Sequence, residues 1–136
     1  MPVSPPPMSD PRPKTMLIIE DDAGLRGTLA AAGEAFGYTV QVCDSEDEGY
    51  RQAVAIKPTL IFCDVHLTKG DGRSVLAKLR ANEAMSDCQF VLMTGDWVGA
   101  SKQTSIEIAA DAYLAKPFSI AEFAACAEER YRQANL

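Results

Sequence analysis

An aliphatic run that ends on a bare carboxylate is the first feature of this sequence that could do chemistry. Residues 60–64 read LIFCD, and Asp64 stands where the apolar residues stop and a polar loop with glycines begins. A buried strand gains no stability from a carboxylate at its tip, because a charge taken out of water must be paired. We therefore expect Asp64 to have a chemical role.

Three other apolar runs also end on reactive polar groups, which are the carboxylates of Glu20, Asp21 and Asp22, the hydroxyl of Thr94 and the ammonium of Lys116. Neighbouring carboxylates repel one another unless one is protonated or a cation enters. Oxygen ligands suit Mg²⁺, which commonly binds one or two carboxylates together with a substrate phosphate. Asp64 could then attack a phosphoryl group and form an aspartyl phosphate, while Lys116 and Thr94 neutralise the charge. Asp22 could equally be only the cap of the next helix.

Five short apolar runs set the fold that must position these groups. They cover residues 16–19, 38–42, 60–63, 90–93 and 112–115, and the segments between them are long enough for one helix each. Five strands alternating with five helices predict an α/β fold with a doubly wound, five-stranded parallel sheet. Ligands bind such sheets at the carboxyl ends of the strands, which is where the reactive groups stand.

The helices are predicted from local signals. Ser45 with Glu48, and Ser119 with Glu122, have the spacing of capping boxes. The segment 99–110 has the weakest helical pattern, because it is rich in polar residues.

Length and composition limit the possible classes of protein. The 136 residues suit one domain, and six of the eight prolines fall in the first 13 residues. We predict a disordered, proline-rich tail over 1–14 and one domain over 15–136. A net charge of −6 argues against direct nucleic-acid binding. Without a span-length apolar stretch or a signal peptide, we expect no membrane partner and a cytoplasmic location.

Four cysteines occur without CxxC or Cys/His spacing, and we expect them to be reduced packing residues: Cys43, Cys63, Cys88 and Cys126.

Four motifs give the chain, over about residues 14–134, a resemblance to the receiver domain of two-component response regulators. They are LIIEDD followed by Arg26, LIFCD followed by Asp71-Gly72, LMTG at 92–95 and ADAYLAKPF at 110–118. The resemblance implies a flavodoxin-like sheet with strand order 2-1-3-4-5.

The resemblance also assigns roles at the site. It makes Asp64 the phosphoryl acceptor and implies that Mg²⁺ is held by Glu20, Asp21, Asp64 and the backbone carbonyl of His66. His66 and Asp96 are expected to flank the phosphoryl group.

Further along the chain, Thr94 and Lys116 match the family's hydroxyl and lysine, and Thr94 with Tyr113 would form the conformational switch. The Lys116–Pro117 bond is expected to be cis. Thr68 stands where the family usually has proline, a change expected to loosen the loop over the site.

These observations predict a stand-alone receiver, not an enzyme in the usual sense. It would accept a phosphoryl group from a sensor histidine kinase or histidine phosphotransfer protein and signal to a downstream protein that the sequence does not name. One alternative is a haloacid-dehalogenase-like phosphatase, because CDVHLT resembles the DxDxT/V motif of that family, although the motif should follow the first strand and the general acid is missing. Another alternative is a pseudo-receiver that binds partners without phosphorylation.

Overall fold

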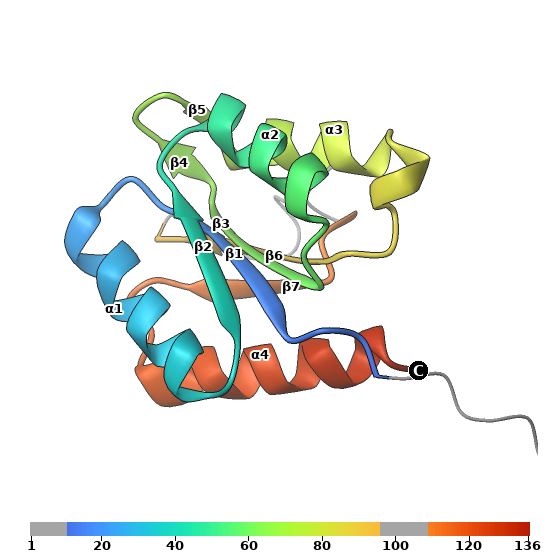
Figure 1. Ribbon diagram of the computed structural model, residues 1–136. Helices are drawn as coiled ribbons and strands as arrows, with labels where there is room; N and C mark the ends of the chain where they lie inside the picture. Colours follow the sequence, from blue (N-terminus) through green and yellow to red (C-terminus); the bar gives the residue numbers. More distant parts are fainter. Residues whose placement is uncertain (1–10, 96–108) are drawn as a thin grey trace, which may run out of the picture.

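A five-stranded parallel sheet forms the centre of the computed structural model, which describes residues 11–95 and 109–136 (Figure 1). The strands are β1 (Thr15–Ile19), β2 (Thr39–Cys43), β3 (Leu60–Asp64), β6 (Gln89–Thr94) and β7 (Ala112–Ala115). Their order is β2-β1-β3-β6-β7, and every neighbouring pair is parallel. The predicted α/β fold and strand order are confirmed. Two short strands, β4 (His66–Leu67) and β5 (Gly70–Asp71), form a separate antiparallel hairpin after β3.

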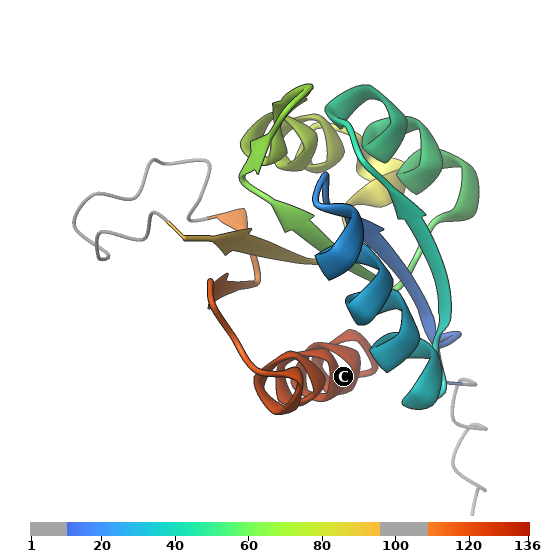
Figure 2. The same ribbon diagram turned by 90° about the vertical axis from the view of Figure 1, so that its left-hand side faces the viewer.

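Helices cover both faces of the sheet, as a doubly wound fold requires. The described helices are α1 (Ala23–Ala35), α2 (Glu46–Ile56), α3 (Gly72–Arg80) and α4 (Ile120–Ala134), with a 3₁₀ turn, η1, at Glu83–Met85. α1 and α4 lie on one face, and α2 and α3 lie on the other (Figures 1 and 2). The remaining predicted helix, 99–110, lies outside the described residues except for its last two. Among the described residues, no helix has both the length and the apolarity needed to cross a membrane.

Side chains from the central strands point alternately to the two faces and build two cores. Leu17, Ile19 and Ile61 belong to the core under α2 and α3, whereas Ile18 and Phe62 belong to the core under α1 and α4. A strand buried on both faces needs a continuous apolar run. This is why the predicted runs coincide with the observed strands to within one or two residues.

The cysteines contribute to the same packing. All four thiols are free, and three are buried. Burial raises the pKa of each thiol, to about 11 for Cys43. Because the thiolate is the reactive form, these thiols are poor nucleophiles, which agrees with the predicted packing role.

The helix starts partly match the local signals. Ser119 and Glu122 form the predicted capping box of α4. At α2, Ser45 accepts a hydrogen bond from the Glu48 amide, but the Glu48 carboxylate accepts from Gln52 instead of the cap backbone. The second half of that predicted capping box is therefore wrong, because a partner further along the helix is preferred.

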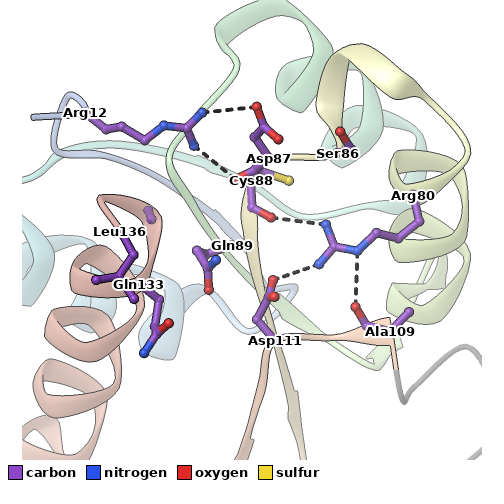
Figure 3. A pocket seen from close by; sticks show the side chains of 11 residues that line it. Arg12, Arg80, Ser86, Asp87, Cys88, Gln89, Ala109, Asp111, Gln133 and Leu136 are labelled. Carbon is purple, nitrogen blue, oxygen red and sulfur yellow. Dashed lines mark hydrogen bonds and ion pairs between the residues drawn. The ribbon is translucent and has the colours of Figure 1, made fainter. Parts of the chain in front are cut away.

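The edge of the sheet at the amino ends of β6 and β7 is closed by ion pairs around a hollow of about 690 Å³ (Figure 3). The Arg80 guanidinium lies 2.7 Å from Asp111 Oδ2 and also donates to the Cys88 and Ala109 carbonyls. The same Asp111 oxygen accepts the Phe90 amide at 2.7 Å. The Arg80 and Asp111 side chains are thus occupied in tying α3 to the start of both strands.

The chain enters the fold beside this hollow. The Pro13 carbonyl accepts hydrogen bonds from the Thr59 hydroxyl and the Thr15 amide, at 2.7 and 2.9 Å. Residues 1–10 lie outside the described residues, so the tail and the domain boundary after residue 14 stay predictions.

Gly72, at the start of α3, provides a test of how tightly the helix packs on β3. A Cβ at this position would lie 2.1 Å from the backbone oxygen of Asp64, whereas a Cβ on Gly27 in α1 would meet nothing within 4 Å. We expect Gly72→Ala to lower the free energy of unfolding by about 1–3 kcal/mol through overpacking. Gly27→Ala should raise it by up to about 1 kcal/mol through helix propensity. Urea denaturation measures both, and equal effects of the two substitutions would contradict this account.

Candidate functional site

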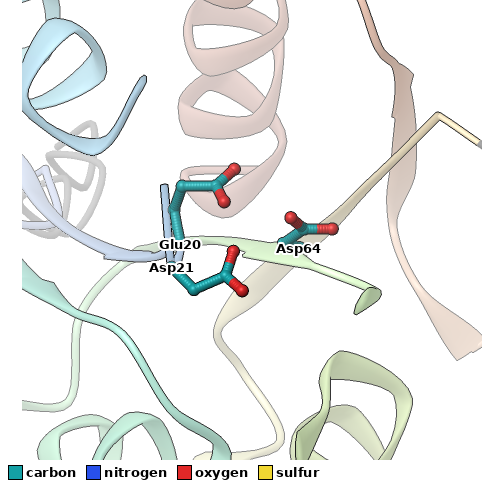
Figure 4. A group of neighbouring side chains, drawn as sticks. All are labelled: Glu20, Asp21 and Asp64. Carbon is teal, nitrogen blue, oxygen red and sulfur yellow. The ribbon is translucent and has the colours of Figure 1, made fainter. Parts of the chain in front are cut away.

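Three carboxylates converge at the carboxyl edge of the sheet. Glu20 and Asp21 follow β1, Asp64 ends β3, and one oxygen from each lies within 4.8 Å of the others (Figure 4). The cause is the parallel register, in which Ile19 pairs with Cys63 so that the next residues of both strands lie side by side. Glu20 is fully buried and Asp64 is 6% exposed. The predicted cluster is therefore brought together by two adjacent strands.

Lys116 supplies a positive charge to this cluster. It follows β7, and its Nζ lies 2.6 Å from Glu20 Oε1 and 2.7 Å from Asp64 Oδ2. Its amide donates to the Thr94 carbonyl at 2.9 Å. The predicted cis bond between Lys116 and Pro117 is confirmed. One ammonium thus bridges two carboxylates that come from different strands.

Burial and these ion pairs act on the protonation of the site in opposite directions. Burial raises the pKa of Glu20 to about 7, and the hydrogen bonds from Lys116 and the Asp22 amide only partly oppose it. Burial alone would lower the pKa of Lys116, but bonds to Asp64 and Glu20 raise it above its usual range. Lys116 therefore stays charged, and Glu20 lies close to the balance between its neutral and ionised forms at neutral pH.

The backbone after β3 fixes the direction of the Asp64 side chain. Asp64 Oδ1 accepts the His66 amide at 3.0 Å, which leaves Oδ2 to Lys116. The Val65 amide donates to the Met93 carbonyl, and the Val65 carbonyl accepts the Gly72 amide, each at 2.9 Å. The His66 side chain is exposed. Asp64 is therefore held from both sides at the end of its strand.

Thr94 and Tyr113 lie on the next two strands. Thr94 ends β6 and is 7% exposed, and β6 pairs with β3 so that Met93 faces Asp64. Tyr113 pairs with Leu92 in the β6–β7 register and packs, half-buried, against the core under α2 and α3. Asp96, expected on the rim of the site, lies outside the described residues.

The Asp22 side chain takes no part in this cluster, although its backbone amide donates to Glu20 Oε2 at 3.2 Å. Its Oδ1 accepts the Leu25 amide at 2.9 Å, as the N-cap of α1. The sequence left open whether Asp22 belongs to the carboxylate cluster or caps the next helix, and in the structure it caps the helix.

Thr68 has a contact that sequence reasoning missed. Its amide and its hydroxyl both donate to Asp21 Oδ2, at 2.8 and 2.6 Å. The expectation that a threonine here loosens the loop is wrong, because its two donors tie the loop to Asp21. The only signal in the sequence was the departure from proline, and a departure by itself does not name a partner.

The donor set fits a hard divalent cation. Glu20, Asp21 and Asp64 offer only oxygen atoms, within the spacing that a single ion can bridge, and hard cations prefer such ligands. Lys116 is one positive charge against three carboxyl groups, so the site retains an excess of acidic groups that a cation would offset.

Known proteins resemble the chain in sequence and in fold. The family model for the response regulator receiver domain matches residues 16–128. The phosphate regulon transcriptional regulatory protein PhoB of Pseudomonas aeruginosa is 31% identical over 112 residues, which are 82% of this chain and 49% of PhoB. The chain thus spans about half the length of this curated relative.

Two solved structures share the fold. A two-component response regulator from Clostridium difficile has a TM-score of 0.79 at 25% identity, over 90% of this chain and 99% of that one. The receiver domain of the sensor histidine kinase PA1611 from Pseudomonas aeruginosa, solved with a magnesium ion coordinated in its active-site cleft, has a TM-score of 0.79 at 22% identity, over 89% and 99%. With its family model matched over most of its length, the chain belongs to the response regulator receiver domain family.

Proposed function

We propose that this receiver domain accepts a phosphoryl group on Asp64 from a phosphohistidine of a sensor histidine kinase or histidine phosphotransfer protein, in a Mg²⁺-dependent reaction. The observation that carries the proposal is the Lys116 ammonium held between Glu20 and Asp64, with Asp21 beside them. A structural ion pair needs one carboxylate, whereas here one ammonium pairs with two and a third carboxylate lies beside them, which suits a site built for a further cation and a phosphoryl group.

The residues divide the work of phosphoryl transfer. An Asp64 carboxylate oxygen would form the new bond to phosphorus as the bond to the histidine nitrogen breaks. Lys116 would offset charge on the phosphoryl oxygens, and the Thr94 hydroxyl would donate to one of them. When bound, Mg²⁺ supplies further charge neutralisation. It would be held by Glu20, Asp21, Asp64 and the His66 carbonyl.

The strand order and the composition of the site argue against both alternative functions. Asp64 ends β3, which is the third strand along the chain, whereas the phosphatase motif belongs after the first strand. A pseudo-receiver would not need Lys116 and three carboxylates to meet. The magnesium ion in the PA1611 receiver supports the same use of this site here. A cytoplasmic location and signalling to an unnamed downstream protein belong to the proposal as predictions.

The conformational change caused by phosphorylation would be transmitted to the surface by Thr94 and Tyr113. A bond from the Thr94 hydroxyl to the phosphoryl group would shift the end of β6, and Tyr113 on the neighbouring β7 would move in response. This would change the face that includes β7 and α4.

Asp64→Asn should abolish phosphorylation by acetyl phosphate in Mg²⁺, because the amide lacks the nucleophilic carboxylate oxygen. Asp22→Asn is the matched control, since asparagine also caps helices and Asp22 serves α1. Intact mass spectrometry measures the adduct, which we expect only on the wild type and on Asp22→Asn.

Other outcomes of this experiment separate the alternatives. Steady release of phosphate from a simple phosphate ester would indicate a phosphatase, and absence of both adduct and turnover would indicate a pseudo-receiver. An adduct on the Asp64→Asn protein, mapped to another residue, would disprove the acceptor assignment.

The raised pKa of Glu20 predicts two opposite effects of pH. Without metal, the folded state holds a proton on Glu20 that the unfolded chain releases at its ordinary pKa of 4.5. The resulting stability is full below pH 4.5 and is lost as pH rises through about 7. Mg²⁺ affinity should instead rise over the same range, because binding displaces this proton. Urea denaturation in EDTA and Mg²⁺ titration, each against pH, measure these effects.

Glu20→Gln is the control for both measurements, because it cannot titrate. Its stability should vary less with pH than that of the wild type. Equal pH slopes for the two proteins would show that Glu20 does not cause the effect.

The switch can be tested with the tyrosine rings as reporters. Proton NMR should show a change in the chemical shifts of the Tyr113 ring on phosphorylation. The ring signals of Tyr50, on α2, should stay unchanged. Both rings pack against the same core cluster, so Tyr50 controls for general changes in the core. Unchanged Tyr113 signals in fully phosphorylated protein would rule out the switch role.

A further inference from the structure

The loop over the site is attached to the carboxylate cluster at a single atom. Thr68 lies between β4 and β5, and both its amide and its hydroxyl donate to Asp21 Oδ2, at 2.8 and 2.6 Å. This contact joins residues 47 positions apart in the chain. Two donors on one oxygen hold a carboxylate in one orientation and leave Asp21 Oδ1 without a bond from Thr68.

The opposite side of the same loop is held by α2. Glu46 Oε1 accepts the Asp71 amide at 2.9 Å, and the Glu46 amide donates to the Lys69 carbonyl at 3.0 Å. Glu46 Oε2 is fixed in turn by Lys78 Nζ at 2.9 Å. At Gly70, φ is +124° and a Cβ would lie 2.3 Å from the Glu46 Cβ, so glycine is required for this approach. The loop is therefore anchored, and Thr68 presents its donors from a fixed position.

Asp21 needs such support more than its neighbours do. Glu20 and Asp64 are buried and bonded to Lys116, whereas the Asp21 side chain is only half-buried and receives no bond from Lys116. Once Glu20 is ionised, above its pKa of about 7, repulsion from the two neighbouring carboxylates favours rotation of Asp21 toward solvent. The bonds from Thr68 oppose this rotation.

We propose that Thr68 is a positioning residue for the divalent cation site, acting through Asp21. This inference rests on the proposed function and adds a residue to it. Removal of a hydrogen-bond donor that orients a metal ligand commonly weakens metal binding by about 10–100-fold. Thr68 keeps Asp21 in the cluster before the cation arrives, so less reorganisation accompanies binding.

The test is the Mg²⁺ dissociation constant, measured by titration calorimetry at a pH above the Glu20 pKa of about 7. Thr68→Val keeps the shape and the amide donor but removes the hydroxyl, and it should weaken Mg²⁺ binding about tenfold. Thr68→Ser keeps both donors and is the matched control, with an affinity close to that of the wild type. Circular dichroism checks that both variants fold, and Thr68→Ala replaces the valine variant if valine perturbs the loop.

A double-mutant cycle identifies the route of the effect. In the Asp21→Ala background, which has no acceptor for Thr68, Thr68→Val should change the Mg²⁺ dissociation constant far less than in the wild type, because residues in one network are not additive. In the metal-free protein, hydrogen exchange of the Thr68 amide should be faster in Asp21→Ala, because alanine lacks the oxygen that accepts this bond.

The outcomes separate this inference from the proposed function. If wild type and Thr68→Val bind Mg²⁺ equally, or the variant binds it more tightly, the positioning role is wrong while the receiver chemistry stands. A wild-type protein that does not bind Mg²⁺ would overturn both.

Discussion

The close approach of Glu20, Asp21 and Asp64 at one sheet edge is the constraint on which the rest of the structure depends. Two of these side chains are buried, and buried carboxylates are costly unless they are paired or protonated. Lys116 meets that need with ion pairs of 2.6 and 2.7 Å. Loss of Lys116 would leave buried carboxylates without a compensating charge, which is strongly destabilising. This edge of the sheet therefore depends on Lys116.

The topology is what allows one lysine to meet that requirement. Glu20 follows β1 and Asp64 ends β3, which are neighbours, while Lys116 follows β7, which lies two strands beyond β3. The bond from its amide to the Thr94 carbonyl aligns the end of β7 with the end of β6. Around Asp64, the absence of a side chain at Gly72 lets α3 begin directly against the strand end. Helix, strand and loop thus meet at the Asp64 carboxylate.

The negative charge of the carboxylates is balanced by the Lys116 ammonium together with either a proton or a cation. In the metal-free protein, Lys116 and a proton on Glu20 share the compensation, because burial raises the Glu20 pKa to about 7. A bound divalent cation would displace this proton. Asp21, at the more exposed side of the cluster, depends instead on hydrogen bonds from Thr68, so the loop over the site and the carboxylates form one unit.

The sequence by itself determined the strands, their alternation with helices and the reactive groups at their ends, from Glu20 to Lys116. Aliphatic runs of strand length are local signals, and parallel topology places their carboxyl ends together. Local signals were also enough for the capping box at Ser119. Only the tertiary structure decided which groups touch. It paired Thr68 with Asp21, and it placed Lys116 between Glu20 and Asp64. These contacts depend on the paths of loops and on partners that are distant in the chain. No local sequence pattern predicts them.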